Sequence, residues 1–350
     1  MRTVVGTMTG TSMDAVDAVA VSIHGHGLEM TADFKTIASV ELGELAIKLR
    51  HLASGNGSTV EMSDAATELG HVTVDAISRL GLDSIDIIAL HGQTIYHKPP
   101  TSIQLIDPAP VFDTYPCTIM TDPRKADLKH GGQGAPITPL ADWVMFRSIE
   151  ASTAIVNLGG FCNVTLIPAA SDPKEIRGFD VCCCNLLINT IARQMLNKQF
   201  DQNGREALRG KLDLAIYDQL LDRLEQQRTS NRSLGTGDDI GEFAVSIGGN
   251  CSPSDLLATA TNATGTCITN SIQGIDRVFL AGGGVHNAAL VKAIQNNGTT
   301  SQLNVPTQAR EGMAMAILGA LSQDGISITL PNITGRKKTS TPVGWVHVRP

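Results

Sequence analysis

The sequence lacks the features that would place the chain in a membrane or in an oxidising compartment. No apolar run approaches the ~18–20 residues of a transmembrane helix. No charged N-terminal region followed by a continuous apolar one predicts a secretory signal. Seven cysteines, an odd number in a chain of 350 residues, do not indicate a disulfide framework. We therefore expect a cytoplasmic protein without a membrane partner.

Basic charge is also scarce. The chain has 27 Lys and Arg residues against 34 Asp and Glu residues, a formal net charge of −7 at pH 7. Its one local basic run is Lys337-Lys338. Because nucleic-acid-binding proteins carry a basic patch or stripe, we predict no nucleic-acid partner. The length predicts two domains rather than one core.

The stretch Val4–Val21 is the first one that suggests a function. Two apolar, β-branched runs flank a polar tip, a pattern that predicts a β-hairpin. Backbone N–H groups near glycine and several hydroxyls at the tip suit a phosphate. The residues concerned are Gly6, Thr9, Gly10, Thr11 and Ser12, and Asp14 and Asp17 could hold Mg²⁺. An ordinary hairpin with a small-residue turn is the alternative.

A second stretch, Thr153–Ile167, repeats this form. An apolar strand enters a turn that contains Asn157, Gly159 and Gly160, and an apolar strand leaves it. The same supersecondary unit therefore opens each half of the chain. We predict a duplicated α/β architecture with a cleft between the halves, in which one hairpin from each half grips a polyphosphate and closure around the nucleotide follows.

Polar or glycine-rich segments follow four predicted strands, where α/β folds build their sites. The segments are His91 with Gln93 and Thr94 after 86–90, Arg124 with Asp127 after 118–121, Asp180 after 176–179, and Gly282-Gly283-Gly284 after 277–281. Asp180 precedes a predicted helix and could act as a general base. The alternatives are a core histidine, a helix cap at Asp180 and tight packing at the glycines.

Other patterns predict the remaining elements. They are a strand within 28–40, helices over 42–53, 58–80, 140–148, 212–226, 254–272 and 311–320, and a loop-like tail from residue 331. Cys182-Cys183-Cys184 is predicted to pack in the loop after Asp180. A metal site there is the alternative, although three consecutive cysteines do not have the spacing of zinc ligands.

Several motifs together resemble the anhydro-N-acetylmuramic acid kinase family, within the actin, sugar-kinase and heat-shock ATPase superfamily. The motifs are Gly10-Thr11-Ser12-Met13-Asp14-Ala15-Val16-Asp17, His91-Gly92-Gln93-Thr94, Asp122-Pro123-Arg124, Gly131-Gly132-Gln133-Gly134-Ala135-Pro136, Asn157-Leu158-Gly159-Gly160-Phe161-Cys162-Asn163, Gly178-Phe179-Asp180, Gly282-Gly283-Gly284 and Glu311-Gly312-Met313-Ala314. The resemblance covers nearly the whole chain.

The resemblance implies an α/β fold of two ribonuclease-H-like lobes, with mixed sheets and flanking helices around a central nucleotide cleft. The predicted N-terminal lobe comprises 1–130 with 331–350, and the C-terminal lobe comprises 131–330. The implied reaction uses ATP and Mg²⁺. Water opens the anhydro bridge of the sugar, and the freed O6 takes the γ-phosphate to give N-acetylmuramic acid 6-phosphate, a step of murein recycling. The resemblance leaves a homodimer open.

The resemblance also implies a role for each site residue. Asp180 is the base that activates water, and Asp14 and Asp17 face the metal. Nucleotide binding falls to Gly10, Thr11, Ser12, Met13, Asp14, Ala15, Val16, Asp17, Asn157, Gly159, Gly160, Gly282, Gly283 and Gly284. Sugar binding falls to His91, Gln93, Thr94, Arg124, Asp127 and Glu311.

The chain departs from the family pattern beside the base. Cys182-Cys183-Cys184 stands where the family has Gly-Pro-Gly, and Asn189 stands where it commonly has Asp. Ala15 and Pro123 replace the usual Gly and Phe. Because cysteine does not readily adopt φ > 0, these changes bear on the substrate and on turnover. A kinase for another anhydro sugar such as levoglucosan, or a non-catalytic homologue that binds nucleotide or sugar, remain alternatives.

Overall fold

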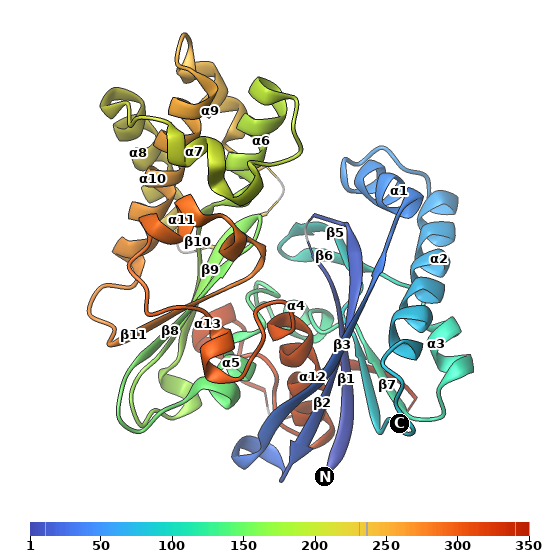
Figure 1. Ribbon diagram of the computed structural model, residues 1–350. Coiled ribbons are helices and arrows are strands. Elements are labelled where there is room, and N and C mark those ends of the chain that lie inside the picture. The colour runs from blue at the N-terminus through green and yellow to red at the C-terminus, as the bar shows by residue number, and fades with distance from the viewer. Residues whose placement is uncertain (11, 231, 236, 340, 350) are drawn as a thin grey trace. The chain divides into compact units, whose positions relative to one another are not determined.

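The computed structural model describes residues 1–10, 12–230, 232–235, 237–339 and 341–349 (Figure 1). The chain divides into two compact units. Unit 1 comprises 1–147, 172–176 and 309–350, and unit 2 comprises 148–171 and 177–308. The sequence-based domain limits stay a prediction. Among the described residues, no helix combines the length and the apolar character needed to cross a bilayer.

Unit 1 is built on a mixed six-stranded sheet. Its strand order is β12 (Val346–Arg349), β7 (Thr118–Thr121), β4 (Ile87–Leu90), β1 (Arg2–Thr9), β2 (Ala15–His24) and β3 (Thr31–Glu41). β1, β2 and β3 form an antiparallel meander, and β4 and β7 run parallel to β1. A separate hairpin consists of β5 (Gln93–Lys98) and β6 (Thr101–Leu105).

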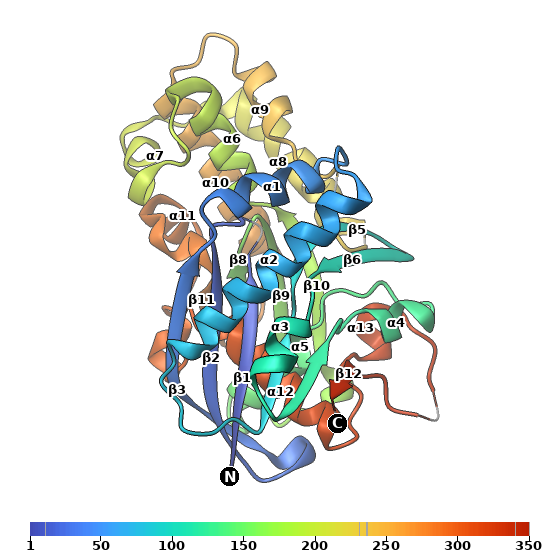
Figure 2. The same cartoon turned by 90° about the vertical axis from the view of Figure 1, so that its right-hand side faces the viewer.

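Helices cover both faces of this sheet. Val5 packs in one hydrophobic cluster with residues of α1 (Glu44–Ala53) and α2 (Thr59–Ser78), and Figure 2 shows α2 crossing the strands. The neighbouring residue Gly6 faces the other way, against α12 (Arg310–Gln323), because successive residues of a strand point to opposite faces. The remaining helices of the unit are α3 (Ala109–Thr114), α4 (Lys125–Lys129), α5 (Pro139–Phe146) and α13 (Pro331–Thr334).

Unit 2 has a four-stranded sheet. Its order is β10 (Arg177–Cys183), β9 (Phe161–Ile167), β8 (Thr153–Leu158) and β11 (Arg277–Ala281). Its helices are α6 (Asn185–Leu196), α7 (Arg205–Arg209), α8 (Leu214–Thr229), α9 (Gly241–Gly248), α10 (Pro253–Ser271) and α11 (Ala288–Ala293). Short 3₁₀ helices occupy Gly27–Glu29, Pro173–Glu175, Gln202–Gly204, Gly283–His286 and Thr300–Leu303.

Four strands of each sheet have the same topology, which confirms the predicted duplication. In each, three consecutive strands form an antiparallel meander, and the fourth strand pairs in parallel with the first. The hairpin β1–β2 opens the first sheet and β8–β9 opens the second. The mixed α/β fold class is likewise confirmed.

Three sequence-based assignments are wrong. The predicted loop Val181–Cys184 is mostly strand, because β10 continues to Cys183 beyond a bulge after Asp180. Asp180 therefore lies inside a strand rather than after one. The tail from residue 331 is not simply a loop, since it forms α13 and then β12, which pairs with β7.

Candidate functional site

The tip of the β1–β2 hairpin is a tight turn. Met13 N–H donates to the Gly10 carbonyl at 3.0 Å, and Met13 adopts a φ of 55°. Its side chain is buried in the cluster under α1 and α2, which anchors the tip. Ser12 is exposed, while Ala15 and Val16 already belong to β2. Thr11, also predicted to bind phosphate, lies outside the described residues.

The two predicted metal ligands have different protein partners. Asp14 lies beside the tip, where its carboxylate forms an ion pair with Arg50 of α1 at 2.9 Å and its side chain is 70% exposed. Asp17 lies within β2 and accepts a hydrogen bond from the Ser39 hydroxyl of β3. Among the described residues, no group of three His, Cys, Asp or Glu side chains could hold a metal. The structure thus offers separate carboxylates rather than a preformed metal cage.

Arg124 connects two histidines in unit 1. It lies between β7 and α4, and its guanidinium donates to His91 Nε2 at 3.3 Å and to His97 Nδ1 at 3.5 Å. His91 Nδ1 donates to the Gly92 carbonyl at 2.9 Å, so Nε2 is the acceptor. Burial, aided by the charge of Arg124, lowers the pKa of His91 to about 3 and that of His97 to about 4. Both imidazoles are therefore neutral at pH 7.

The face of β5 that carries His97 also carries Gln93, four residues earlier. His97 Nδ1 accepts hydrogen bonds, so its proton resides on Nε2. His97 Nε2 and Gln93 Oε1 are buried and have no hydrogen-bond partner among the residues that the structure describes. Thr94 Oγ1 accepts from Gln104 of β6 at 3.3 Å. A buried donor and a buried acceptor of this kind suit the hydroxyls of a sugar.

Asp127 has a different environment from the histidine cluster. It is fully buried, and its carboxylate accepts from Gly134 N–H at 2.8 Å and from the Thr334 hydroxyl at 2.7 Å. Arg336 pairs with it at 3.6 Å. These contacts join the 131–136 glycine turn to the C-terminal segment of unit 1. The structure thus gives Asp127 a role in fixing the turn.

Glu311 lies in the first turn of α12 and is half-buried. The preceding residue, Arg310, is almost completely buried and forms a bidentate ion pair with Asp142 of α5. Because removal of either partner would leave the other as an unpaired buried charge, the fold requires both in place. The start of α12, and Glu311 with it, is therefore fixed to α5.

In unit 2, the β8–β9 turn caps a helix. The Gly159 carbonyl accepts from Asn185 N–H at 3.1 Å, and the Gly160 carbonyl accepts from Cys184 and Leu186 N–H at 2.9 and 3.2 Å. Cys184 provides no side-chain cap for α6, so these carbonyls anchor its first turn. A Cβ at Gly159 would lie 3.1 Å from the Phe161 carbonyl oxygen, so the tightness of the turn favours glycine there.

The glycine triplet after β11 packs against the same turn. A Cβ at Gly282, whose φ is 79°, would lie 2.7 Å from Asn157 Oδ1, and a Cβ at Gly284 would lie 2.6 Å from Leu158 Cβ. A Cβ at Gly283 would meet no atom within 4 Å. Tight packing therefore accounts for Gly282 and Gly284, while Gly283 faces open space.

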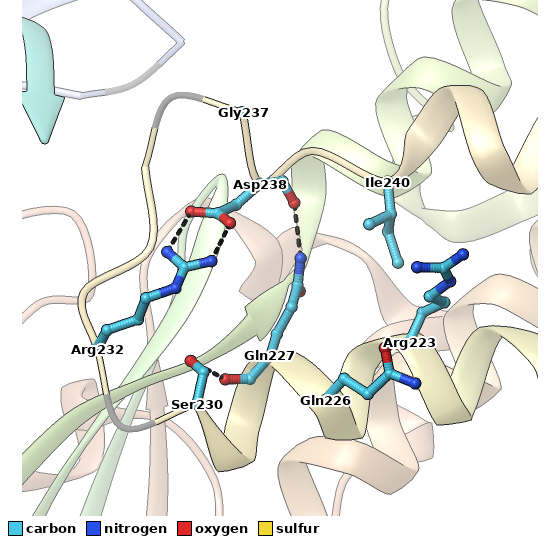
Figure 3. Close-up of a pocket in the computed structure, with 8 residues that line it drawn as sticks. All are labelled: Arg223, Gln226, Gln227, Ser230, Arg232, Gly237, Asp238 and Ile240. Carbon is cyan, nitrogen blue, oxygen red and sulfur yellow. Dashed lines mark hydrogen bonds and ion pairs between the residues drawn. The ribbon is translucent and has the colours of Figure 1, made fainter.

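The loop that follows α8 holds Asp180. Leu234 N–H donates to Asp180 Oδ2 at 2.8 Å, and the Leu234 side chain is buried. The same loop borders a hollow of about 270 Å³ (Figure 3). Its lining residues are Arg223, Gln226, Gln227, Ser230, Arg232, Gly237, Asp238 and Ile240.

The three consecutive cysteines belong to the core of unit 2. All are buried, none has a positive φ, and they pack in one cluster with Cys162 and Cys267. Burial raises the pKa of the Cys184 thiol to about 12 and also raises that of Cys183. Their burial in this cluster accounts for the three cysteines as packing residues.

Sequence reasoning missed His97 and Gln227. The signal for His97 was available, because residues 93, 95 and 97 share one face of a strand that begins with a predicted site residue. No sequence signal identifies Gln227. It lies 47 positions from Asp180, and the fold brings its side chain to Cys183 of the same strand.

Comparisons with known proteins agree in one description. A family model described as anhydro-N-acetylmuramic acid kinase matches residues 2–346. A protein of that name from Salinibacter ruber is 30% identical over 385 residues, covering 99% of this chain and 96% of its own. Another from Hydrogenovibrio crunogenus is 31% identical over 362 residues, covering 96% and 95%.

Two solved structures are also similar. A ROK family glucokinase from Streptomyces griseus, solved with glucose and AMPPNP, has a TM-score of 0.39 at 10% identity and covers 91% of this chain and 99% of its own. The activator of the 2-hydroxyisocaproyl-CoA dehydratase from Clostridium difficile, with bound ADPNP, has a TM-score of 0.47 at 13% identity, covering 92% and 96%.

Proposed function

We propose, on the premise that this chain belongs to the anhydro-N-acetylmuramic acid kinase family, that it phosphorylates 1,6-anhydro-N-acetylmuramic acid with ATP. The reaction opens the anhydro bridge with water and yields N-acetylmuramic acid 6-phosphate, an intermediate of murein recycling. Its use of ATP fits a cytoplasmic location. The observation that carries the proposal is the retained Asp180, whose carboxylate is held by a backbone N–H at 2.8 Å.

Asp180 is the general base of the proposed reaction. Its carboxylate takes a proton from water as the water oxygen bonds to the anomeric carbon of the sugar. The bond from that carbon to O6 breaks, and O6 bonds to the γ-phosphorus of ATP as the bond to the β–γ bridging oxygen breaks and ADP leaves. Phosphoryl transfer itself depends mainly on positioning and charge neutralisation, so this single proton transfer is the main acid–base demand on the protein.

The residues of the hairpin tip fit a nucleotide with Mg²⁺. Carboxylate oxygens are ligands that Mg²⁺ prefers, and Asp14 is mostly exposed. Its ion pair with Arg50 is also exposed, hence weak and exchangeable. Asp14 and Asp17 would face the ion, which when bound offsets phosphate charge. The tip residues 10–17, Asn157, Gly159, Gly160 and the triplet 282–284 would hold ATP, with Gly283 on the open side.

For the sugar, we assign direct contacts to the histidine cluster and its neighbours. These residues are Gln93, Thr94, His97, Arg124 and Glu311. Neutral His97 serves this purpose because its Nε2 proton is a donor without a partner among the described residues. His91 would take part in sugar binding through Arg124, since its two ring nitrogens already bond Gly92 and Arg124. Asp127 would act indirectly, through the glycine turn that it fixes.

A coupled ADP-release assay tests the proposed function. Wild-type protein is supplied with ATP, Mg²⁺ and either anhydro-N-acetylmuramic acid or levoglucosan. We expect turnover of the first sugar and a loss of about 100-fold or more in kcat for Asp180→Asn, because removal of a general base costs that much.

The outcomes separate the alternatives. Turnover of levoglucosan in preference to anhydro-N-acetylmuramic acid would assign the chain to another anhydro sugar. Stabilisation by ATP without ADP release from either sugar would favour a non-catalytic homologue. Equal kcat for wild type and Asp180→Asn would show that the assignment of the base is wrong.

A further inference from the structure

A side chain of α8 accepts a hydrogen bond from a backbone N–H group of the edge strand β10. β10 is the outermost strand of its sheet, so one side of its backbone does not pair with another strand. Cys183 N–H, on that side, donates to Gln227 Oε1 at 2.8 Å. Gln227 is half-buried and lies in the last turn of α8. An edge donor that would otherwise need water is thus satisfied within the protein.

The other end of Gln227 holds the loop that contacts Asp180. Gln227 Nε2 donates to the Asp238 backbone carbonyl at 2.7 Å (Figure 3). The Asp238 carboxylate binds Arg232 in a bidentate pair and accepts from Gly235 N–H at 2.8 Å. We call the described residues 232–235 and 237–239 the Asp180 loop. One amide side chain therefore joins the strand that carries Asp180 to this loop.

The charges within the loop are consistent with a fixed arrangement. Burial alone would raise the pKa of Asp238, but its hydrogen bonds with Arg232 and Gly235 outweigh burial and lower it. The hydrogen bond to Asp238 also raises the pKa of Arg232, and the charge of Asp180 adds to this effect. Arg232 therefore stays cationic near the proposed base. Its ion pair with Asp238 joins the first residues of the loop to the last.

We propose that Gln227 is a positioning residue for Asp180. By bonding Cys183 and Asp238 at once, it fixes the Asp180 loop against β10 and so keeps Leu234 N–H on Asp180 Oδ2. The kinetic consequence rests on the proposed function, in which Asp180 is the general base. The structural consequence does not, and it can be measured separately.

Hydrogen–deuterium exchange measures the structural part on the full chain. Gln227→Glu keeps an acceptor for Cys183 N–H but replaces the donor to the Asp238 carbonyl with an oxygen. We expect the amides of the Asp180 loop, Leu234 included, to exchange about tenfold faster in this variant. The adjacent Gln226→Glu is the matched control, since Gln226 is exposed and its side chain donates to Asp222 on the same helix. Equal exchange in both variants would overturn the proposal.

Kinetics with anhydro-N-acetylmuramic acid measure the catalytic part. We expect kcat of Gln227→Glu to fall about tenfold with KM within about twofold, because the base is misplaced while sugar contacts persist. Gln226→Glu should retain wild-type kcat. Faster loop exchange with unchanged kcat would overturn the positioning role. A wild-type protein that turns over no anhydro sugar would instead contradict the proposed function, while the exchange result would still decide the link through Gln227.

Discussion

At the scale of single residues, the cluster around Arg124 shows how burial sets the chemistry of a histidine. One guanidinium lies within hydrogen-bond distance of His91 and close to His97, so protonating either ring would place like charges together in a buried site. Both rings remain neutral, and the partners of Nδ1 fix the proton positions. The result is an acceptor at His91 Nε2 and a donor at His97 Nε2.

The neutral state of His91 predicts how stability depends on pH. An accessible imidazole has a pKa of 6.5, whereas that of His91 is about 3 in the folded protein. Between these values the unfolded chain binds a proton that the folded chain does not. The free energy of unfolding therefore falls as pH decreases through this window, and His91 contributes up to about 1.4 kcal/mol per pH unit.

Urea denaturation between pH 7 and pH 4 measures this dependence. We expect His91→Gln to unfold at lower urea concentration at pH 7, but with a shallower pH slope than wild type. His71→Gln is the matched control, because His71 is exposed on α2 and remote in sequence from the cluster. Identical slopes for wild type and His91→Gln would contradict a neutral His91.

At the scale of elements, β10 shows a strand that continues through an unusual run of cysteines. Cysteine behaves as a small hydrophobic residue, so Val181 to Cys184 fill the core of unit 2 where a loop was predicted. Cys182 forms a side-chain hydrogen bond with Cys267, and this contact, with burial, raises its pKa well above the ordinary value. These thiols should be inert in the folded protein.

Thiol labelling tests this inertness. At pH 8, we expect iodoacetamide to modify Cys117 and Cys251, which are only partly buried, before any of the five buried cysteines. The reason is that the thiolate is the reactive form and burial disfavours it. Mass spectrometry of peptides locates the label, and unfolding in urea should expose all seven sites. Rapid labelling of Cys183 in the native protein would contradict the packing of β10.

Local sequence signals predicted the elements whose contacts are close along the chain. Helix α2 is an example: a helix was predicted over 58–80, and in the structure Ser58 and Glu61 form a capping box at its start. The two glycine hairpins followed from apolar runs on either side of a glycine-containing turn. Long-range pairs had no such signal: β12 pairs with β7 across more than 200 residues, and Gln227 meets Cys183 across 44. Candidate residues at strand ends were therefore found more easily than the residues that position them.

At the scale of the whole molecule, unit 1 is assembled from both ends of the chain. α12 packs so closely on β1 that a Cβ at Gly6 would lie 2.0 Å from the Gly312 carbonyl oxygen. The segment after α12 continues this closure, because Thr334 and Arg336 contact the buried carboxylate of Asp127. The sheet of unit 1 thus packs against a segment that lies about 300 positions further along the sequence.

Truncation at the C-terminus tests the contacts with Asp127. A chain that ends at Leu330 lacks Thr334 and Arg336, so Asp127 retains the Gly134 N–H but loses its cation. We expect the free energy of unfolding to fall by about 3–5 kcal/mol, the cost of a buried charge left without its partner. A chain that ends at Val343 is the control, since it lacks β12 but keeps Thr334, Arg336 and the bond from Ile328 N–H to the Val343 carbonyl. If urea denaturation gives the two truncated chains equal stability, the loss belongs to β12 rather than to the Asp127 contacts.

Asp127→Asn in the chain that ends at Leu330 tests the same cause directly. If the unpaired buried charge destabilises that chain, the substitution should restore part of its stability. If the loss belongs to β12, the substitution should leave its stability unchanged.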